Sequence, residues 1–281
     1  MQTVRAALAT VLAAGLLGAG AVAAVSGAVP TAAGAARALC GQYDRAPSAD
    51  GRYVVQNNRW GADTAQCVTP RERGLALTTS RHDVPTDGPP AGYPSIVWGC
   101  HWGTCSPGAA PLRADDPRFR SVRTQLAAAL VPEGAWNLSY DVWFDPQPRT
   151  DGQVSGTEVM VWLAAAGGVQ PVGARTGTAQ LAGERWEVWH AAPEPARPWR
   201  VVSYVREGAL GAPAPATARA DLPVTAFHAD AAARGWVGPA WWLTSVQAGF
   251  EVWRGGEGLA LSGFSAGPGP VVERRARTPR R

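Results

Sequence analysis

Short runs of alternating hydrophobic and polar residues fill most of the chain after residue 40. Val, Trp, Tyr and Phe recur within these runs, and clusters of Gly, Pro, Asn and Asp separate them. This pattern is typical of β-strands joined by turns. The best runs are 51–59, 75–79, 136–145, 156–163, 185–189, 199–206, 243–253 and 259–265.

A single segment, 224–234, has helical spacing instead. Val224, Phe227 and Ala231 fall on one helical face, and Gly235 follows as a stop signal. Many strands with one helix predict an all-β fold. The expected architecture is a β-jelly-roll sandwich of two antiparallel sheets with one helix.

Three of the predicted strands carry carboxylates and tryptophans on the face opposite their aliphatic residues. These faces hold Asp141 and Trp143 in the first strand, Glu158, Met160 and Trp162 in the second, and Gln247, Glu251 and Trp253 in the third. A flat indole stacks on the apolar face of a sugar ring, and two carboxyl groups flanking a glycosidic bond can hydrolyse it. The pattern therefore indicates a carbohydrate-active surface, while each carboxylate taken singly is also consistent with an exposed strand residue.

The composition limits the other possibilities. Hydrophobic residues make up 46% of the 281 residues, which excludes wholesale disorder, and 33 Gly with 24 Pro argue against a helix bundle. We therefore interpret the Pro/Ala-rich stretch 191–220 as loops within one domain, apart from the strand that it contains. The net charge of +4 equals that of 273–281, which holds five Arg and one Glu. With a near-neutral body, no nucleic acid is expected as a partner.

The N-terminal segment has the features of a secretion signal. Arg5 precedes an apolar run rich in Ala, Leu and Gly at 6–24, and small residues follow it. A retained membrane anchor is the alternative, but the Ala/Gly content makes the run only weakly hydrophobic. We expect a secreted, extracellular protein with no stable membrane association after signal removal.

The four cysteines fit that compartment. An even number of cysteines in a secreted chain indicates disulfides, and four cysteines allow three pairings. Cys100 and Cys105 enclose only four residues, so we expect them to close a tight loop and Cys40 to pair with Cys67. A metal site is the alternative, but the pairs lack CxxC spacing and His101 is the only histidine near them.

Several motifs occur together in an order typical of one enzyme family. They are GRYVVQNNRWG at 51–61, YPS at 93–95, GCHWGTC at 99–105, YDVW at 140–143, TEVMVW at 157–162, QPVG at 170–173 and SVQAGFEVW at 245–253. On these motifs the chain resembles glycoside hydrolase family 12, the small secreted endo-β-1,4-glucanases. The resemblance implies a catalytic domain at 40–267, between a signal peptide and disordered lead at 1–39 and a disordered basic tail at 268–281. It also implies an open substrate cleft on the concave face of the sandwich.

The resemblance implies a role for each matching residue. Glu158 takes the place of the nucleophile, Glu251 that of the acid/base, and Asp141 that of the residue that sets the protonation of the nucleophile. No metal and no organic cofactor are expected. The expected substrate-binding residues are Asn58, Trp60, His101, Trp102, Met160, Trp162 and Gln247.

The implied activity is internal hydrolysis of a β-glucan polysaccharide by a retaining double displacement, carried out by a monomer. A xyloglucan-specific hydrolase or a transglycosylase would use the same residues. A catalytically silent carbohydrate-binding protein would keep the tryptophans without needing the glutamates. Residues 191–198 replace the Gly/Asn-rich turn expected after Trp189, and 213–220 resembles an insertion, so substrate preference stays open.

Overall fold

The computed structural model describes residues 37–211 and 214–269, in which two β-sheets dominate. The strands of the larger sheet are β1 (Arg45–Pro47), β2 (Val54–Gln56), β5 (Ser95–His101), β6 (Thr104–Cys105), β7 (Leu112–Arg113), β9 (Ala135–Asp145), β10 (Thr157–Ala166), β11 (Ala174–Leu181), β12 (Glu184–Ala191), β13 (Arg200–Arg206) and β15 (Trp242–Arg254). The strands of the smaller sheet are β3 (Gln66–Arg71), β4 (Gly74–Ser80), β8 (Val122–Ala129), β14 (Thr217–Pro223) and β16 (Ala260–Pro268). The helices are the 3-10 helix η1 (Pro117–Ser121) and α1 (Val224–Ala233).

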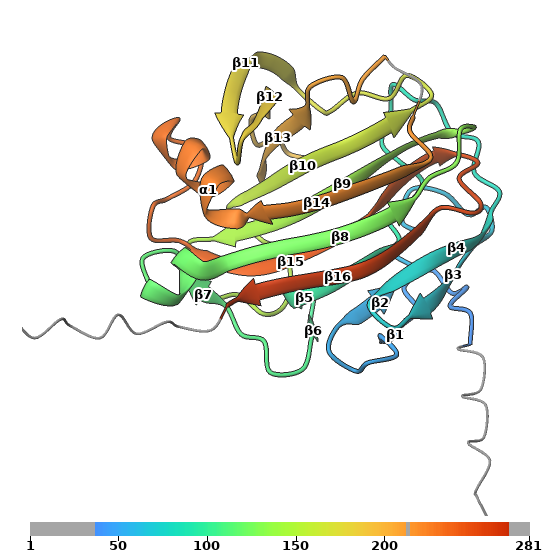
Figure 1. Ribbon diagram of the computed structural model, residues 1–281, viewed down its shortest axis with the longest axis horizontal. Coiled ribbons are helices and arrows are strands. Elements are labelled where there is room, and N and C mark those ends of the chain that lie inside the picture. The colour runs from blue at the N-terminus through green and yellow to red at the C-terminus, as the bar shows by residue number, and fades with distance from the viewer. Residues whose placement is uncertain (1–36, 212–213, 270–281) are drawn as a thin grey trace, which may run out of the picture. The chain divides into compact units, whose positions relative to one another are not determined.

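The two sheets form the predicted sandwich. The larger sheet has the order β1-β2-β5-β15-β9-β10-β13-β12-β11, with β6 on β5 and β7 on β15, and the smaller has the order β14-β8-β16-β4-β3. In Figure 1 the strands β14, β8 and β16 lie in front of β10, β9 and β15, the central strands of the larger sheet.

One strand pair departs from the antiparallel arrangement that we expected. Strands β10 and β13 are parallel, with Glu158 opposite Val201. The chain leaves β10 to begin β11 at the far edge of the sheet and returns through β12, so β13 arrives beside β10 in the same direction. The prediction of purely antiparallel sheets is therefore wrong at this one pair.

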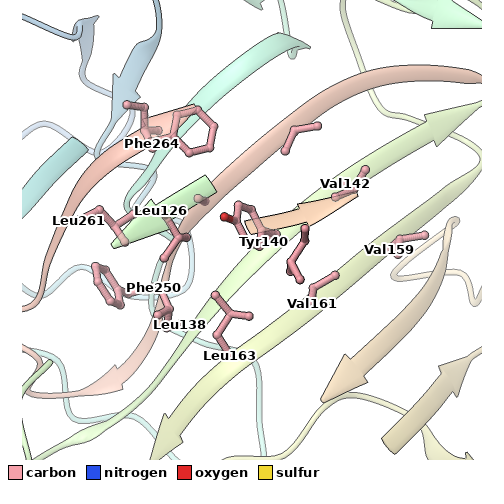
Figure 2. Close-up of a cluster of buried hydrophobic side chains, with 14 of the residues drawn as sticks. Leu126, Leu138, Tyr140, Val142, Val159, Val161, Leu163, Phe250, Leu261 and Phe264 are labelled. Atoms are coloured by element: carbon pink, nitrogen blue, oxygen red, sulfur yellow. The ribbon is translucent and has the colours of Figure 1, made fainter. Parts of the chain in front are cut away.

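The main core fills the space between the sheets, as Figure 2 shows. Alternate residues of each strand point into this core, because successive side chains in a strand leave on opposite faces. The intervening residues of the central strands lie on the outer face of the larger sheet. The labelled core residues are Leu138, Tyr140 and Val142 of β9, Val159, Val161 and Leu163 of β10, Phe250 of β15, Leu126 of β8, and Leu261 and Phe264 of β16.

The outer face of the larger sheet is itself partly covered. Met160, Trp162 and Trp253 belong to a second apolar cluster there, together with Val201 and Val205. Every residue of β9, on both faces, is buried. Polar side chains on this face therefore stand in a poorly hydrated environment, which matters for the carboxyl groups described below.

Three strands of the smaller sheet, β3, β8 and β14, lie where the sequence pattern predicted none. Strand β14 occupies part of the stretch 191–220, which we interpreted as loops, and pairs with β8 along seven residues. Both strands are rich in Ala, which has a weak preference for strands, and their outward positions carry Arg and Gln. Buried and exposed positions do alternate in these strands, but many of the residues are alanines, so the hydrophobic pattern was too weak to predict a strand.

The helix and the disulfides agree with the predictions. Helix α1 is followed by Gly235 with a φ of +74°, a left-handed conformation that glycine adopts without steric cost. The disulfides Cys40–Cys67 and Cys100–Cys105 are both formed. No helix in the described part of the chain is long and apolar enough to cross a bilayer.

The predicted signal peptide and basic tail lie mostly outside the described residues. At their inner ends the structure is regular. Leu39, which we assigned to the disordered lead, exchanges two backbone hydrogen bonds with Val68, at 2.8 and 3.0 Å. Pro268, which we assigned to the tail, is the last residue of β16.

Candidate active site

Three adjacent strands bring the predicted catalytic residues to one face of the larger sheet. Asp141 lies on β9, opposite Met160 of β10 on one side and Gln247 of β15 on the other. Glu158 and Glu251 lie on these flanking strands. All three carboxyl residues occupy the alternate positions that point away from the main core, as the sequence pattern predicted.

Glu158 is 9% exposed and is held by neighbours that favour its charged form. The indole N–H of Trp199 donates a hydrogen bond to Glu158 Oε2 at 2.8 Å. Burial raises the pKa of Glu158 to about 7, while hydrogen bonds from Trp199 and Asp141 and the charge of Arg197 act in the opposite direction. Glu158 is thus a buried carboxyl whose ionised form is supported by donors and by a cation.

Asp141 is paired with Glu158 by a side-chain hydrogen bond. Burial raises the pKa of Asp141 well above its usual range, and the charges of Glu158 and Glu251 raise it further. Ser139 contributes a hydrogen bond from its hydroxyl to Asp141 Oδ1 at 3.3 Å. A protonated Asp141 donates to the Glu158 carboxylate, so the two side chains share one proton across adjacent strands.

Glu251 has a different environment. Its register partner on β9 is Asn137, whose side-chain amide donates to Glu251 Oε2. The backbone N–H of Glu251 in turn donates to Asn137 Oδ1 at 3.2 Å. Burial raises the pKa of Glu251 to about 8, and the negative charge of Glu158 adds to the effect, whereas the Asn137 contact lowers the pKa. Unlike Glu158, Glu251 has no cation among the described groups that lower its pKa.

A polar network extends from Gln247 along the same face. The Gln56 amide donates to Gln247 Oε1 at 3.1 Å and to the Ser95 hydroxyl oxygen at 2.9 Å. Gln247 donates to the Ser245 hydroxyl oxygen at 3.3 Å. Nearby, the buried Tyr93 hydroxyl donates to the Ser139 carbonyl at 3.1 Å. These bonds fix the side chains beside Asp141 in one arrangement.

The predicted substrate-binding residues separate into buried and exposed groups. Met160 and Gln247 lie beside Asp141 and are almost fully buried. Trp162 is only 1% exposed and packs in the second apolar cluster. Its indole has almost no surface to offer a sugar in this structure, and its contact with substrate stays a prediction.

Trp60 and Trp102 are the exposed members, at 44% and 54%. Trp102 lies at the tip of the Cys100–Cys105 hairpin with a φ of +47°, and Asn58 has a φ of +42°. Both residues have the left-handed backbone conformation that glycine or asparagine usually adopts, and Trp102 lies in a turn. Their contact with substrate stays a prediction, as does the open cleft that we expected on this face.

His101 links the disulfide hairpin to the central strands. Its ring lies 5.0 Å from that of Trp143, which is the register partner of Glu158 on β9. Burial lowers the pKa of His101 to about 4, so the imidazole is neutral near pH 7. His101 therefore contributes packing near the site and no charge.

Three residues that influence the glutamates, two by hydrogen bonds and Arg197 by its charge, were not identified from the sequence. Asn137 shares the strand face of Asp141, so the alternation could have revealed it. The sequence stretch 137–139 also forms a glycosylation sequon, but Asn137 is fully buried against Glu251. Arg197 belongs to a Pro-rich loop whose course the pattern did not predict, and Trp199, which we placed at the start of the strand 199–206, is the last residue of that loop. In the described residues no group of three or more His, Cys, Asp or Glu side chains is placed to hold a metal ion.

Comparisons with known proteins relate this chain to one family of enzymes. The family model for glycosyl hydrolase family 12 matches residues 51–267. The probable cellulase Cel12b of Mycobacterium tuberculosis is 31% identical over 146 residues, which cover 47% of this chain and 81% of that protein. The xyloglucan-specific endo-β-1,4-glucanase A of Emericella nidulans is 25% identical over 169 residues, which cover 54% of this chain and 61% of that protein.

A solved structure extends the comparison to three dimensions. The endoglucanase cel12A from Rhodothermus marinus superposes with a TM-score of 0.73 at 39% identity, covering 82% of this chain and 98% of that one. The match includes the strands that carry both glutamates and Asp141, since the family model spans 51–267. The chain therefore belongs to glycosyl hydrolase family 12 and is a glycoside hydrolase.

Proposed function

We propose that this protein is an endo-acting β-1,4-glucanase that works by a retaining double displacement. The observation that carries the proposal is the pair Glu158 and Glu251, two buried carboxyl groups on strands that flank Asp141, of which Glu158 has a cation and two hydrogen-bond donors beside it and Glu251 has the Asn137 amide. A glycosidase needs such a pair, one group ionised and the other protonated. The names of the relatives, cellulase and endoglucanase, support the choice of a β-1,4-glucan as substrate.

In the first step Glu158 acts as the nucleophile and Glu251 as the general acid. The Glu158 carboxylate attacks the anomeric carbon, and the bond from that carbon to the glycosidic oxygen breaks. Glu251 gives its proton to the departing oxygen, and a glycosyl ester of Glu158 forms. Asp141 keeps its proton and its hydrogen bond to Glu158, which lowers the cost of holding the carboxylate in a buried site before attack.

In the second step Glu251 acts as a base. Ester formation removes the charge of Glu158, which was one cause of the raised pKa of Glu251. Glu251 then takes a proton from water, and the water oxygen attacks the anomeric carbon. The ester bond breaks and the Glu158 carboxylate returns. Two inversions at the same carbon leave its configuration retained.

Substitution of each glutamate separates the two roles. Glu158→Ala should leave a space in which azide attacks an activated β-glycoside and yields the α-azide. Glu251→Ala should still form the ester from an activated substrate, and azide should intercept it to yield the β-azide. An α-azide from Glu251→Ala, or near-wild-type hydrolysis by Glu158→Ala, would contradict the assignment.

The endo mode is tested on soluble carboxymethyl-cellulose. Internal cleavage lowers viscosity well before many reducing ends appear. Release of a single short product from chain ends would contradict internal cleavage. The two disulfides support secretion into an oxidising compartment, since such bonds persist there.

Xyloglucan is the second candidate substrate. A relative named as a xyloglucan-specific endo-β-1,4-glucanase is 25% identical to this chain. Rates on carboxymethyl-cellulose, mixed-linkage β-glucan and xyloglucan, measured side by side, decide between the two. A kcat/KM on xyloglucan that exceeds that on the unbranched glucans would replace the first proposal with the second. Sugar transfer to added cello-oligosaccharide in the same reactions would show transglycosylation.

A further inference from the structure

The loop that joins β12 to β13 ends directly beside Glu158. Trp199 is the last residue before β13, in which Val201 is the parallel register partner of Glu158. Because Trp199 precedes Val201 by only two residues, its indole N–H lies 2.8 Å from Glu158 Oε2. This loop is also the segment, 191–198, that departs from the turn expected for the family.

Arg197 fastens the two ends of this loop. Its guanidinium donates to the Trp199 carbonyl at 2.5 Å and to the Ala192 carbonyl at 2.7 Å. Arg197 also exchanges two backbone hydrogen bonds of 2.9 Å with Glu194, whose carboxylate lies 3.7 Å from the guanidinium. The side chain of Arg197 is only 14% exposed, although it belongs to a surface loop. An arginine that is ordered by two carbonyls at once acts as a structural clamp.

Packing holds the Trp199 ring from the other side. The ring centres of Trp199 and Trp143 are 5.7 Å apart, and Trp143 in turn contacts His101 at 5.0 Å. Trp199 is thus held at two places. Arg197 binds its backbone carbonyl, and Trp143 packs against its indole ring. Its N–H has one defined direction, toward Glu158.

We propose that Arg197 and Trp199 are positioning residues for Glu158, and that the loop 192–199 sets the orientation and charge of this carboxylate. The inference rests on the proposed function, because it matters for catalysis only if Glu158 is the nucleophile. Neither residue transfers a proton or forms a bond in the reaction. Trp199 acts by donating to the carboxylate, and Arg197 acts by fixing Trp199 and by its positive charge.

The charged and titratable groups around Glu158 determine the direction of the effect. Asp141 faces it from β9, Glu251 interacts with it from β15, and the Tyr93 hydroxyl lies near all three carboxyl groups. Arg197 is the cation of this set, and Trp199 is the second hydrogen-bond donor besides Asp141. Loss of either contribution raises the pKa of Glu158. A larger fraction of Glu158 is then protonated at a given pH, and the acidic limb of kcat/KM moves to higher pH.

Three variants test this device. Trp199→Phe keeps an aromatic ring and removes the N–H donor, Arg197→Gln removes the charge, and Arg197→Lys restores the charge without the two-carbonyl clamp. Arg185→Gln is the matched control, since Arg185 is an exposed arginine whose ion pair in the described part of the chain is with Glu207, at 3.3 Å. Thermal unfolding shows whether each variant is folded.

Trp199→Phe should lower kcat/KM on a soluble β-glucan about tenfold to a hundredfold and move its acidic limb up by about one pH unit. Arg197→Gln should shift the limb in the same direction, and Arg197→Lys should recover part of the shift. Arg185→Gln should match the wild type. A wild-type rate and pH profile for Trp199→Phe would overturn the inference, and so would an equal effect of Arg185→Gln and Arg197→Gln.

A measurement without substrate separates this inference from the proposed function. Carbon-13 NMR of protein labelled at the glutamate carboxyl groups reports the pKa of Glu158 in wild type and in Trp199→Phe. A higher pKa in the variant supports the positioning device even if the wild type hydrolyses no β-glucan, in which case the proposed function alone fails. An unchanged pKa contradicts the device whatever the activity.

Discussion

Asn137→Ala provides a direct test of Glu251 as the acid/base. The Asn137 amide donates to the Glu251 carboxylate, and Asn137 Oδ1 accepts the backbone N–H of Glu251 at 3.2 Å. Burial raises the pKa of Glu251 to about 8, and the Asn137 contact is the one that lowers it. Removal of the amide therefore raises the pKa of Glu251 further.

The size of the shift follows from the strength of the lost contact. A hydrogen bond to a charged group contributes about 1.5–3 kcal/mol, and one pKa unit corresponds to about 1.4 kcal/mol. The pKa of Glu251 should thus rise by about one to two units. Since the general acid must be protonated, activity should persist to higher pH, and the basic limb of kcat/KM should move up. The acidic limb should stay in place, because Asn137 does not contact Glu158.

The assay compares two aryl cellobiosides across a range of pH. A substrate with a poor leaving group needs protonation by Glu251, whereas a dinitrophenyl substrate leaves with little help. The variant should shift the basic limb only for the first substrate, with a rate loss of about tenfold from the less restrained carboxyl. Gln125→Ala, which removes an amide paired with Asp221 on the smaller sheet, is the control. A basic limb that stays fixed or moves down would refute the reasoning.

Three further predictions concern other parts of the site and the fold. Asp141→Asn should fold normally, lower the rate about tenfold and move the acidic limb up, because an amide donates more weakly to Glu158 than a carboxylic acid does; an unchanged pH–rate profile would contradict the shared proton. Glu251→Gln should be more stable than the wild type at pH 8 by about 2–4 kcal/mol but equal to it near pH 4. The pKa of Glu251 is higher in the folded than in the unfolded protein, so the wild type loses unfolding free energy as the pH increases from the unfolded to the folded pKa, whereas the glutamine variant does not. Denaturant unfolding at both pH values checks this. Removal of the Cys40–Cys67 disulfide, which closes a separation of 27 residues, should cost about 3.5 kcal/mol of unfolding free energy in chemical denaturation, and a midpoint equal to that of the wild type would show that the bridge adds nothing.

The pH predictions share one physical cause. The outer face of the larger sheet is covered by apolar residues, so three carboxyl groups stand where charge is poorly solvated. Only one of them is supported in its charged form by both donors and a cation. Burying these carboxyl groups lowers the unfolding free energy of the protein at neutral pH, and this loss accompanies a site that holds an ionised nucleophile beside a protonated acid.

Much of the fold was determined by the sequence alone. Period-two alternation in the segments of β9, β10 and β15 assigned Asp141, Glu158 and Glu251 to the faces opposite the core, because side chains in a strand alternate regardless of which strand lies beside it. Helix α1 and the Cys100–Cys105 disulfide were likewise local features, set by spacing and by a short loop, and the Cys40–Cys67 disulfide joins the two cysteines that remain. The motifs around the two glutamates were sufficient to indicate the family.

Only the tertiary structure decided which residues meet. Strand order and register place Asn137 opposite Glu251 and Asp141 between the two glutamates, and no single strand contains this information. The parallel pairing of β10 with β13 brings Trp199, distant by 41 residues, to Glu158. Trp162, by contrast, has the sequence context of a binding residue but is covered by the second apolar cluster. Alternation shows the face on which a side chain lies, whereas burial, hydrogen-bond partners and pKa depend on the neighbours that the fold supplies.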